Sequence, residues 1–148
     1  MKRLFILSLL ALCACSGASF RDYYWDGKLL VPSGDLYDIT IAFFDTDAGD
    51  TFLINQVSDG ELLPGCGAEV RYTIRRGELD FEPFDLKYQD KNGQILTAKM
   101  RSGRLDGNRL TLLGFDLVDG KTENYTAFLD RGRETELYSL QKMAGKRR

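Results

Sequence analysis

The chain has 148 residues, with 20 Lys and Arg against 22 Asp and Glu, and a formal charge of −2. This slightly acidic balance argues against nucleic acid as a partner, because binding there requires a clustered basic surface. Histidine is absent from the sequence, which excludes Ser-His-Asp and Cys-His catalysis and most zinc and copper sites. We therefore expect no metal centre and no cofactor.

The N-terminus begins with Lys2 and Arg3, followed by an uncharged, mostly apolar run over residues 4–14. This order is typical of a secretory signal peptide. A helix rises ~1.5 Å per residue and needs ~20 residues to cross the hydrocarbon core of a bilayer, so the run is too short to span one. We therefore predict an N-terminal signal helix that directs export.

The apolar run ends in Leu12-Cys13-Ala14-Cys15. This segment resembles the lipobox of bacterial lipoproteins, and the resemblance covers residues 1–16. It implies that signal peptidase cleaves between Ala14 and Cys15, and that Cys15 carries a diacylglycerol and fatty acids such as palmitate, enough for stable anchoring. Ser16 stands where many Gram-negative lipoproteins of the inner membrane have Asp. By this analogy we expect the outer membrane, with the protein facing the periplasm. Ordinary secretion, with cleavage near Ala18, is the alternative.

Cleavage at this point would leave 134 residues, enough for one domain with a real core. Because Lys2 and Arg3 are lost, 18 basic residues would face 22 acidic ones. We divide the chain into a signal peptide (1–14), a lipidated tether (15–24) and a single β-domain (25–148). With Cys13 removed and Cys15 acylated, Cys66 is the last cysteine, so an intrachain disulfide is impossible. Cys66 stands between Gly65 and Gly67, a context that predicts a turn.

Alternation of apolar and polar residues with a period of two predicts strands along most of the domain. The tether leads into Tyr23, Tyr24 and Trp25, where the aromatic rings could stack on sugars, lie at a membrane surface, or close the base of a barrel. The alternating apolar sets that follow are Tyr37, Ile39, Ile41 and Phe43; Val70, Tyr72 and Ile74; Leu96, Ala98 and Met100; and Tyr125, Ala127 and Leu129.

Glycine-containing pairs between these runs predict tight turns, because glycine accepts a positive φ. Two runs change phase, at Pro83 and at Gly114, and each change predicts a bulge or bend. Residues 134–144 fit either a helix or a final strand. The predicted turn pairs are Ser33-Gly34, Asp59-Gly60, Arg76-Gly77, Asn92-Gly93, Ser102-Gly103, Asp106-Gly107 and Asp119-Gly120.

Strands at this spacing, joined by short turns, predict an all-β fold: an antiparallel up-and-down barrel of about eight strands, after the signal helix. The segment from Trp25 to Pro32 and the series of glycine turns behind it resemble small lipocalin-like barrels of bacterial envelope proteins. This resemblance covers most of the mature chain and implies the barrel. A shared fold by itself says little about function.

Two acidic groups are candidate sites with simpler explanations. Residues 45–50 contain three aspartates, as calcium loops do, but Ala48 precedes the glycine and Gln56 stands where an EF-hand has Glu, so we expect a solvated loop. Asp80, Glu82 and Asp85 surround Pro83 and could act as acid and base in a hydrolase. We interpret them as outward polar positions of a strand and assign no catalytic residue.

We therefore expect a non-enzymatic, membrane-anchored envelope lipoprotein whose barrel binds a small apolar ligand or an envelope protein. The ligand carrier predicts a cavity lined by Tyr37, Ile39, Phe43, Val70 and Tyr72. The interaction module predicts a packed core and an exposed patch. An envelope hydrolase that uses the three surface carboxylates is the alternative function.

Overall fold

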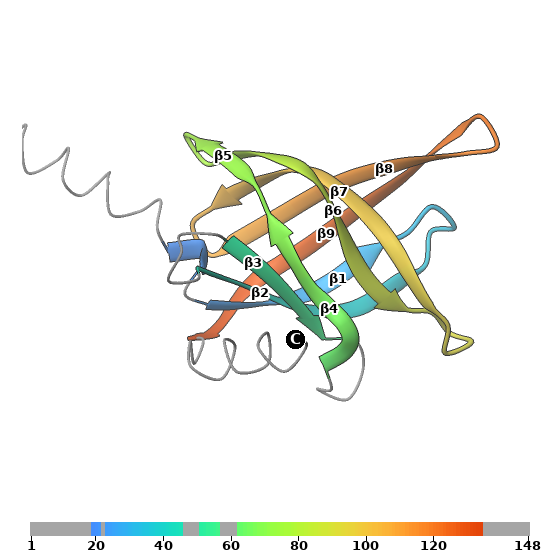
Figure 1. Cartoon of the computed structure of the whole chain (residues 1–148), viewed down its shortest axis with the longest axis horizontal. Coiled ribbons are helices and arrows are strands. Elements are labelled where there is room, and N and C mark those ends of the chain that lie inside the picture. The colour runs from blue at the N-terminus through green and yellow to red at the C-terminus, as the bar shows by residue number, and fades with distance from the viewer. Residues whose placement is uncertain (1–18, 22, 46–50, 57–61, 135–148) are drawn as a thin grey trace, which may run out of the picture.

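The computed structural model describes residues 19–21, 23–45, 51–56 and 62–134, which form a single antiparallel barrel (Figure 1). The elements follow one another along the chain with short connections. They are the 3-10 helix η1 (Ser19–Arg21) and the strands β1 (Tyr23–Leu30), β2 (Leu36–Asp45), β3 (Thr51–Gln56), β4 (Leu62–Val70), β5 (Tyr72–Arg75), β6 (Glu78–Gln89), β7 (Ile95–Asp106), β8 (Arg109–Val118) and β9 (Lys121–Glu134).

The strands form one sheet in the order β4-β3-β2-β1-β9-β8-β7-β6-β5. Neighbours in the sheet are neighbours in sequence, except that β1 pairs with β9. The two edge strands β4 and β5 are separated in the chain by Arg71 alone, whose carbonyl accepts a hydrogen bond from the Glu82 amide at 2.9 Å. β4 and β5 thus act as one bent strand that nearly closes the barrel. The predicted all-β, up-and-down barrel is confirmed; the predicted signal helix lies outside the described residues.

The core lies inside the barrel and is built from alternate residues of the strands, as expected for a sheet with one buried face. Ile39, Ile41 and Phe43 of β2 are buried there, as the alternation predicts. The inward side chains form one continuous cluster. Its buried members are Phe20, Trp25, Leu29, Val31, Ile39, Ile41, Phe43, Leu53, Val70, Leu79, Phe81, Phe84, Leu86, Tyr88, Ala98, Met100, Leu110, Leu112, Tyr125, Ala127 and Leu129.

Folded structure extends N-terminal to residue 25, into the range 15–24 that the sequence analysis assigns to the tether. β1 begins at Tyr23, and Phe20 of η1 is fully buried. The Trp25 indole is also fully buried, and its Nε1 donates a hydrogen bond to the Phe20 carbonyl at 2.7 Å. Of the three roles considered for this aromatic segment, burial at one end of the barrel applies to Trp25.

Most of the predicted turns are present. Arg76-Gly77 and Asp119-Gly120 connect their strands with positive φ at both positions (52° and 81°; 51° and 76°), the geometry that a two-residue hairpin requires. The turn predicted at Ser102-Gly103 is wrong, because both residues lie inside β7. The turn-like interpretation of Cys66 is also wrong, since it lies within β4, where Gly67 pairs with Ile54 of β3. Asp59-Gly60 lies outside the described residues.

The two phase changes have different outcomes. At Pro83 the pairing of β6 with β7 shifts register between Asp80 and Phe84, which confirms the predicted irregularity. At Gly114 the pairing is also irregular, because the register of β7 with β8 shifts between Met100 and Ser102, but the bulge lies in β7 and β8 itself keeps one phase. A Cβ on Gly114 would stand 1.9 Å from the Lys99 carbonyl oxygen, so glycine is required by this close backbone approach.

Candidate functional site

The barrel interior holds all five residues that the sequence analysis assigns to a ligand cavity. Ile39, Phe43 and Val70 are buried members of the core cluster, and Tyr37 and Tyr72 are partly buried and pack against it. Their side chains are therefore in contact with other core side chains. The sequence analysis correctly predicts the face on which they lie.

Aromatic rings close the end of the barrel that lies beside η1. The Phe20 ring meets Phe43 and Tyr72 edge-to-face, with centroids 5.2 and 5.3 Å apart. The next residue, Arg21, forms an ion pair with Asp45 at 2.7 Å, and the Thr51 hydroxyl donates to the same carboxylate at 2.8 Å. We call this the tether end, because residues 15–18 lead into it.

Three tyrosines lie together within the barrel away from the tether end. The Tyr88 ring centroid is 5.4 Å from that of Tyr37 and 6.4 Å from that of Tyr125. Burial, together with the neighbouring tyrosines Tyr125 and Tyr37 and with Asp90, raises the pKa of Tyr88 to about 12. Burial and the carboxylates of Glu123 and Asp116 also raise the pKa of Tyr125. These hydroxyls are thus held in the neutral, hydrogen-bonding form.

Because of this tyrosine cluster, we expect the free energy of unfolding to fall at alkaline pH. The folded pKa of Tyr88 lies above its ordinary value of 10.0, so its contribution to the free energy of unfolding is complete below pH 10 and is lost as pH rises towards 12. Between pH 10 and 12 the wild type should lose on the order of 2 kcal/mol more stability than Tyr88→Phe, which cannot ionise at this position. Urea unfolding followed by circular dichroism at both pH values measures this difference; parallel losses would contradict the assignment.

Asn55 is a buried polar residue that the sequence analysis did not identify. Its Nδ2 donates to the Lys87 carbonyl at 2.6 Å, and the Lys87 amide donates to its Oδ1 at 3.5 Å. The amide group thereby replaces a missing strand partner, because β5 pairs with β6 only as far as Phe81. Asn55 thus joins β3 to β6 where the barrel wall is incomplete. Nothing in the local sequence distinguishes it from a surface asparagine.

The three carboxylates of the alternative hydrolase hypothesis are exposed on β6. Asp80 and Glu82 line an open pocket of about 450 Å³ together with Arg71, Tyr72, Thr73, Phe81 and Pro83, and Asp85 does not line it. A carboxylate oxygen of Glu82 lies 3.8 Å from Arg71 Nη1, and one of Asp85 lies 3.9 Å from Lys99 Nζ. Exposed ion pairs of this length are ordinary features of a solvated sheet surface.

A group of large apolar side chains projects from the outer face of β8 and β9. Leu113, Phe115 and Leu117 alternate along β8 and are 47%, 40% and 66% exposed. Phe128 of β9 is 52% exposed and lies diagonal to Leu113, since it pairs with Thr111. Diagonal neighbours on one face of a sheet are within reach of aromatic side chains. We call these four residues the β8 patch. Its three β8 residues are those that the predicted phase change at Gly114 would have turned inward.

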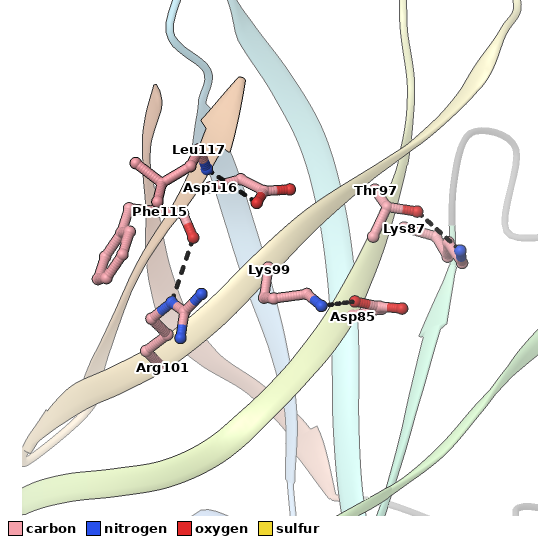
Figure 2. A network of polar contacts seen from close by, with 8 residues as sticks. All are labelled: Asp85, Lys87, Thr97, Lys99, Arg101, Phe115, Asp116 and Leu117. Carbon is pink, nitrogen blue, oxygen red and sulfur yellow. Dashed lines mark hydrogen bonds and ion pairs between the residues drawn. The ribbon is translucent and has the colours of Figure 1, made fainter. Parts of the chain in front are cut away.

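The basic side chain of Arg101, on β7, lies against the β8 patch (Figure 2). The Arg101 guanidinium lies over the Phe115 ring, 4.2 Å from its centroid, and its Nε donates to the Phe115 carbonyl at 3.2 Å. Lys99 reaches Asp85, and the Lys87 ammonium donates to the Thr97 hydroxyl at 2.7 Å (Figure 2). Among the described residues, Arg101 has no carboxylate within ion-pair distance.

Nothing in the described part of the chain forms a cluster of acidic, cysteine or histidine side chains suited to a metal ion. Residues 46–50 of the acidic loop lie outside the described residues, and Asp45 is held by Arg21 and Thr51 as given above. The described segments contain no helix with the length and apolar character needed to cross a bilayer. Comparisons with family models, with curated proteins and with solved structures give no match.

Proposed function

We propose that this protein is a non-enzymatic lipoprotein of the bacterial outer membrane, anchored through Cys15, whose barrel binds a partner protein of the envelope through the β8 patch. The lipobox-like segment supports the anchoring. The observation that carries the binding role is the exposure of four large apolar side chains on one outer face, since contiguous exposed apolar groups of this kind mark interaction sites.

The packing of the interior favours a protein partner over a small apolar ligand. The five residues that would line a ligand cavity belong to, or pack against, one continuous cluster of side chains. A ligand of ordinary size requires a pocket of roughly 300–1,000 Å³. Phe43, which would line such a cavity, is fully buried, and its ring contacts those of Phe20 and Phe81.

The position of the β8 patch favours a partner at a distance from the anchoring membrane. Phe115 of the β8 patch pairs with Asn124 of β9. From Asn124, β9 runs ten residues further to Glu134, which pairs with Tyr23 at the tether end. Ten residues of strand cover roughly 34 Å, or about 25 Å along the axis of a barrel whose strands tilt by about 40°. Residues 15–18 extend at most about 14 Å. The β8 patch therefore reaches into the periplasm when the barrel stands on its tether end.

The residues around the β8 patch indicate the chemistry of the partner surface. Arg101 lies over the face of the Phe115 ring and brings a positive charge to the boundary of the apolar group. Aromatic and arginine side chains are the types most enriched at the energetic centres of interfaces. We expect a partner surface that pairs an apolar patch with a carboxylate placed to meet Arg101.

Site-specific photo-crosslinking in intact envelopes tests this function. A photo-crosslinking amino acid is placed at position 117 in the β8 patch and, as a matched control, at position 38, an exposed outward position of β2. We expect an adduct with one envelope protein from position 117 alone. The variant Phe115→Asp should remove this adduct without changing the circular dichroism spectrum of the protein, and mapping of the crosslink should place it beside an acidic residue of the partner.

Several outcomes would contradict the proposal. An adduct of twice the chain mass would show that a second copy covers the β8 patch, and an adduct with phospholipid would show that a membrane does. Equal labelling from positions 117 and 38 would show that the patch has no specific partner. If the protein adduct persists in the Phe115→Asp variant, the partner does not bind through the β8 patch.

A further inference from the structure

A second apolar group lies on the outer face of the barrel, on β1, β2 and β3. Ala42 and Phe44 alternate with the inward residues of β2, and Ile54 of β3 pairs with Ala42. Tyr24 and Phe52 pack against them, and the rings of Phe44 and Phe52 are stacked with centroids 5.9 Å apart. We call these five residues the outer cluster.

The outer cluster and the β8 patch face outward alike, yet their exposure differs greatly. Ala42, Phe44 and Ile54 are 1%, 1% and 5% exposed, whereas the side chains of the β8 patch are 40–66% exposed. Tyr24 and Phe52 project from the same sheet face, and neighbours in one layer shield each other's sides but cannot cover the layer from above. The outer cluster must therefore be covered by residues beyond the described strands.

We infer that residues 135–148 of this chain fold back over the outer cluster and cover it. β9 ends at Glu134, which pairs with Tyr23, so the chain leaves the sheet directly beside Tyr24. The Arg133 guanidinium lies 4.8 Å from the centre of the Tyr24 ring, which brings the end of β9 to the border of the cluster. The following segment therefore starts next to the surface that needs a cover.

The composition and length of this segment match that surface. Leu137, Leu140 and Ala144 share one face if the segment is helical. Fourteen residues of helix extend about 21 Å, and three neighbouring strands span about 10 Å between the outer two, so the segment is long enough to cross the cluster.

The other undescribed segments are less suited as covers. Residues 46–50 are Thr-Asp-Ala-Gly-Asp and contain no large apolar side chain, and residues 57–61 contain Val57 alone. Residues 1–14 would be removed with the signal peptide. Residues 15–18 are Cys-Ser-Gly-Ala and would be directed to the membrane. This inference does not depend on the partner proposed for the β8 patch.

Thiol accessibility in the full-length protein tests this contact. Ile54→Cys places a small thiol in the outer cluster, and Cys13→Ser, Cys15→Ser and Cys66→Ser remove the three native ones. We expect slow labelling by a water-soluble maleimide, and labelling at least about tenfold faster when Leu137→Asp and Leu140→Asp are added. Leu117→Cys, in the exposed β8 patch, is the matched control and should label fast with or without these changes. Equal protection of position 54 in both backgrounds would overturn the inference.

Disulfide trapping gives an independent result if the charged variant fails to fold. With Leu137→Cys and Ile54→Cys in the same background without native cysteines, mild oxidation should form an intramolecular disulfide. The pair Leu137→Cys and Leu117→Cys should remain reduced. Failure of position 137 to join position 54, or joining to position 117 instead, would overturn the placement of the segment. A disulfide between two molecules would assign the cover to a second copy.

Discussion

Replacing Trp25 by alanine is expected to lower the free energy of unfolding by about 3–5 kcal/mol, the usual cost of removing a large buried aromatic side chain. The indole is fully buried, and its Nε1 hydrogen bond to the Phe20 carbonyl holds η1 against the end of the barrel. Because a domain of this size is stable by about 5–15 kcal/mol, the loss would remove a large part of its stability.

The conservative variant Trp25→Phe separates packing from hydrogen bonding. It retains most of the ring volume but leaves the buried Phe20 carbonyl without its donor, so we expect a smaller loss of about 1–3 kcal/mol. Urea unfolding must be followed by circular dichroism, since Trp25 is the single tryptophan of the chain. Leu36→Ala, at a position that is 57% exposed, is the control and should change stability by no more than about 0.5 kcal/mol. A loss below about 1 kcal/mol for Trp25→Ala would contradict the structural role given to η1.

Replacing Cys15 by serine is expected to abolish incorporation of labelled palmitate and to leave the precursor uncut. The thioether to diacylglycerol requires the thiol, and in the lipoprotein family this lipid precedes cleavage. Cys13→Ser, two residues away, is the matched control and should retain both labelling and processing. If Cys15→Ser is still labelled and Cys13→Ser is not, the lipid is attached to Cys13 instead.

The pattern of strands could be predicted from the sequence because one face of each strand is buried. The alternation at Tyr37–Phe43 and at Val70–Ile74 follows directly from that difference between faces. The pairs Arg76-Gly77 and Asp119-Gly120 were also predictable, since their positive φ values belong to the turn itself. These features depend on residues close together in the chain.

The two apolar outer surfaces could not be predicted, because they depend on contacts between strands. In β8 the residues Leu112 and Leu113 are adjacent and equally apolar, so the sequence does not show which phase points inward. The pairing decides it: the backbone of β7 approaches Gly114 at Lys99, and Leu113 therefore faces outward. Phe43 and Phe44 of β2 present the same ambiguity. A strand that is apolar in both phases is the one sequence signal that could have revealed such surfaces.

The segment between the proposed lipid anchor and the folded barrel is shorter than the sequence analysis expects. With Phe20 buried and β1 starting at Tyr23, residues 15–18 alone separate a lipid on Cys15 from η1. If Cys15 carries the proposed lipid, this short connection keeps the tether end of the barrel near the membrane. The proposed orientation of the β8 patch towards the periplasm therefore depends on acylation of Cys15.

Intact-mass spectrometry of the native protein, purified from outer membranes, tests the anchoring most directly. We expect the mass of residues 15–148 plus a diacylglycerol and a further acyl chain, with fragmentation that places the lipid on the first residue. A protein that retains residues 1–14, or one that begins elsewhere or carries an unmodified thiol at position 15, would contradict the account.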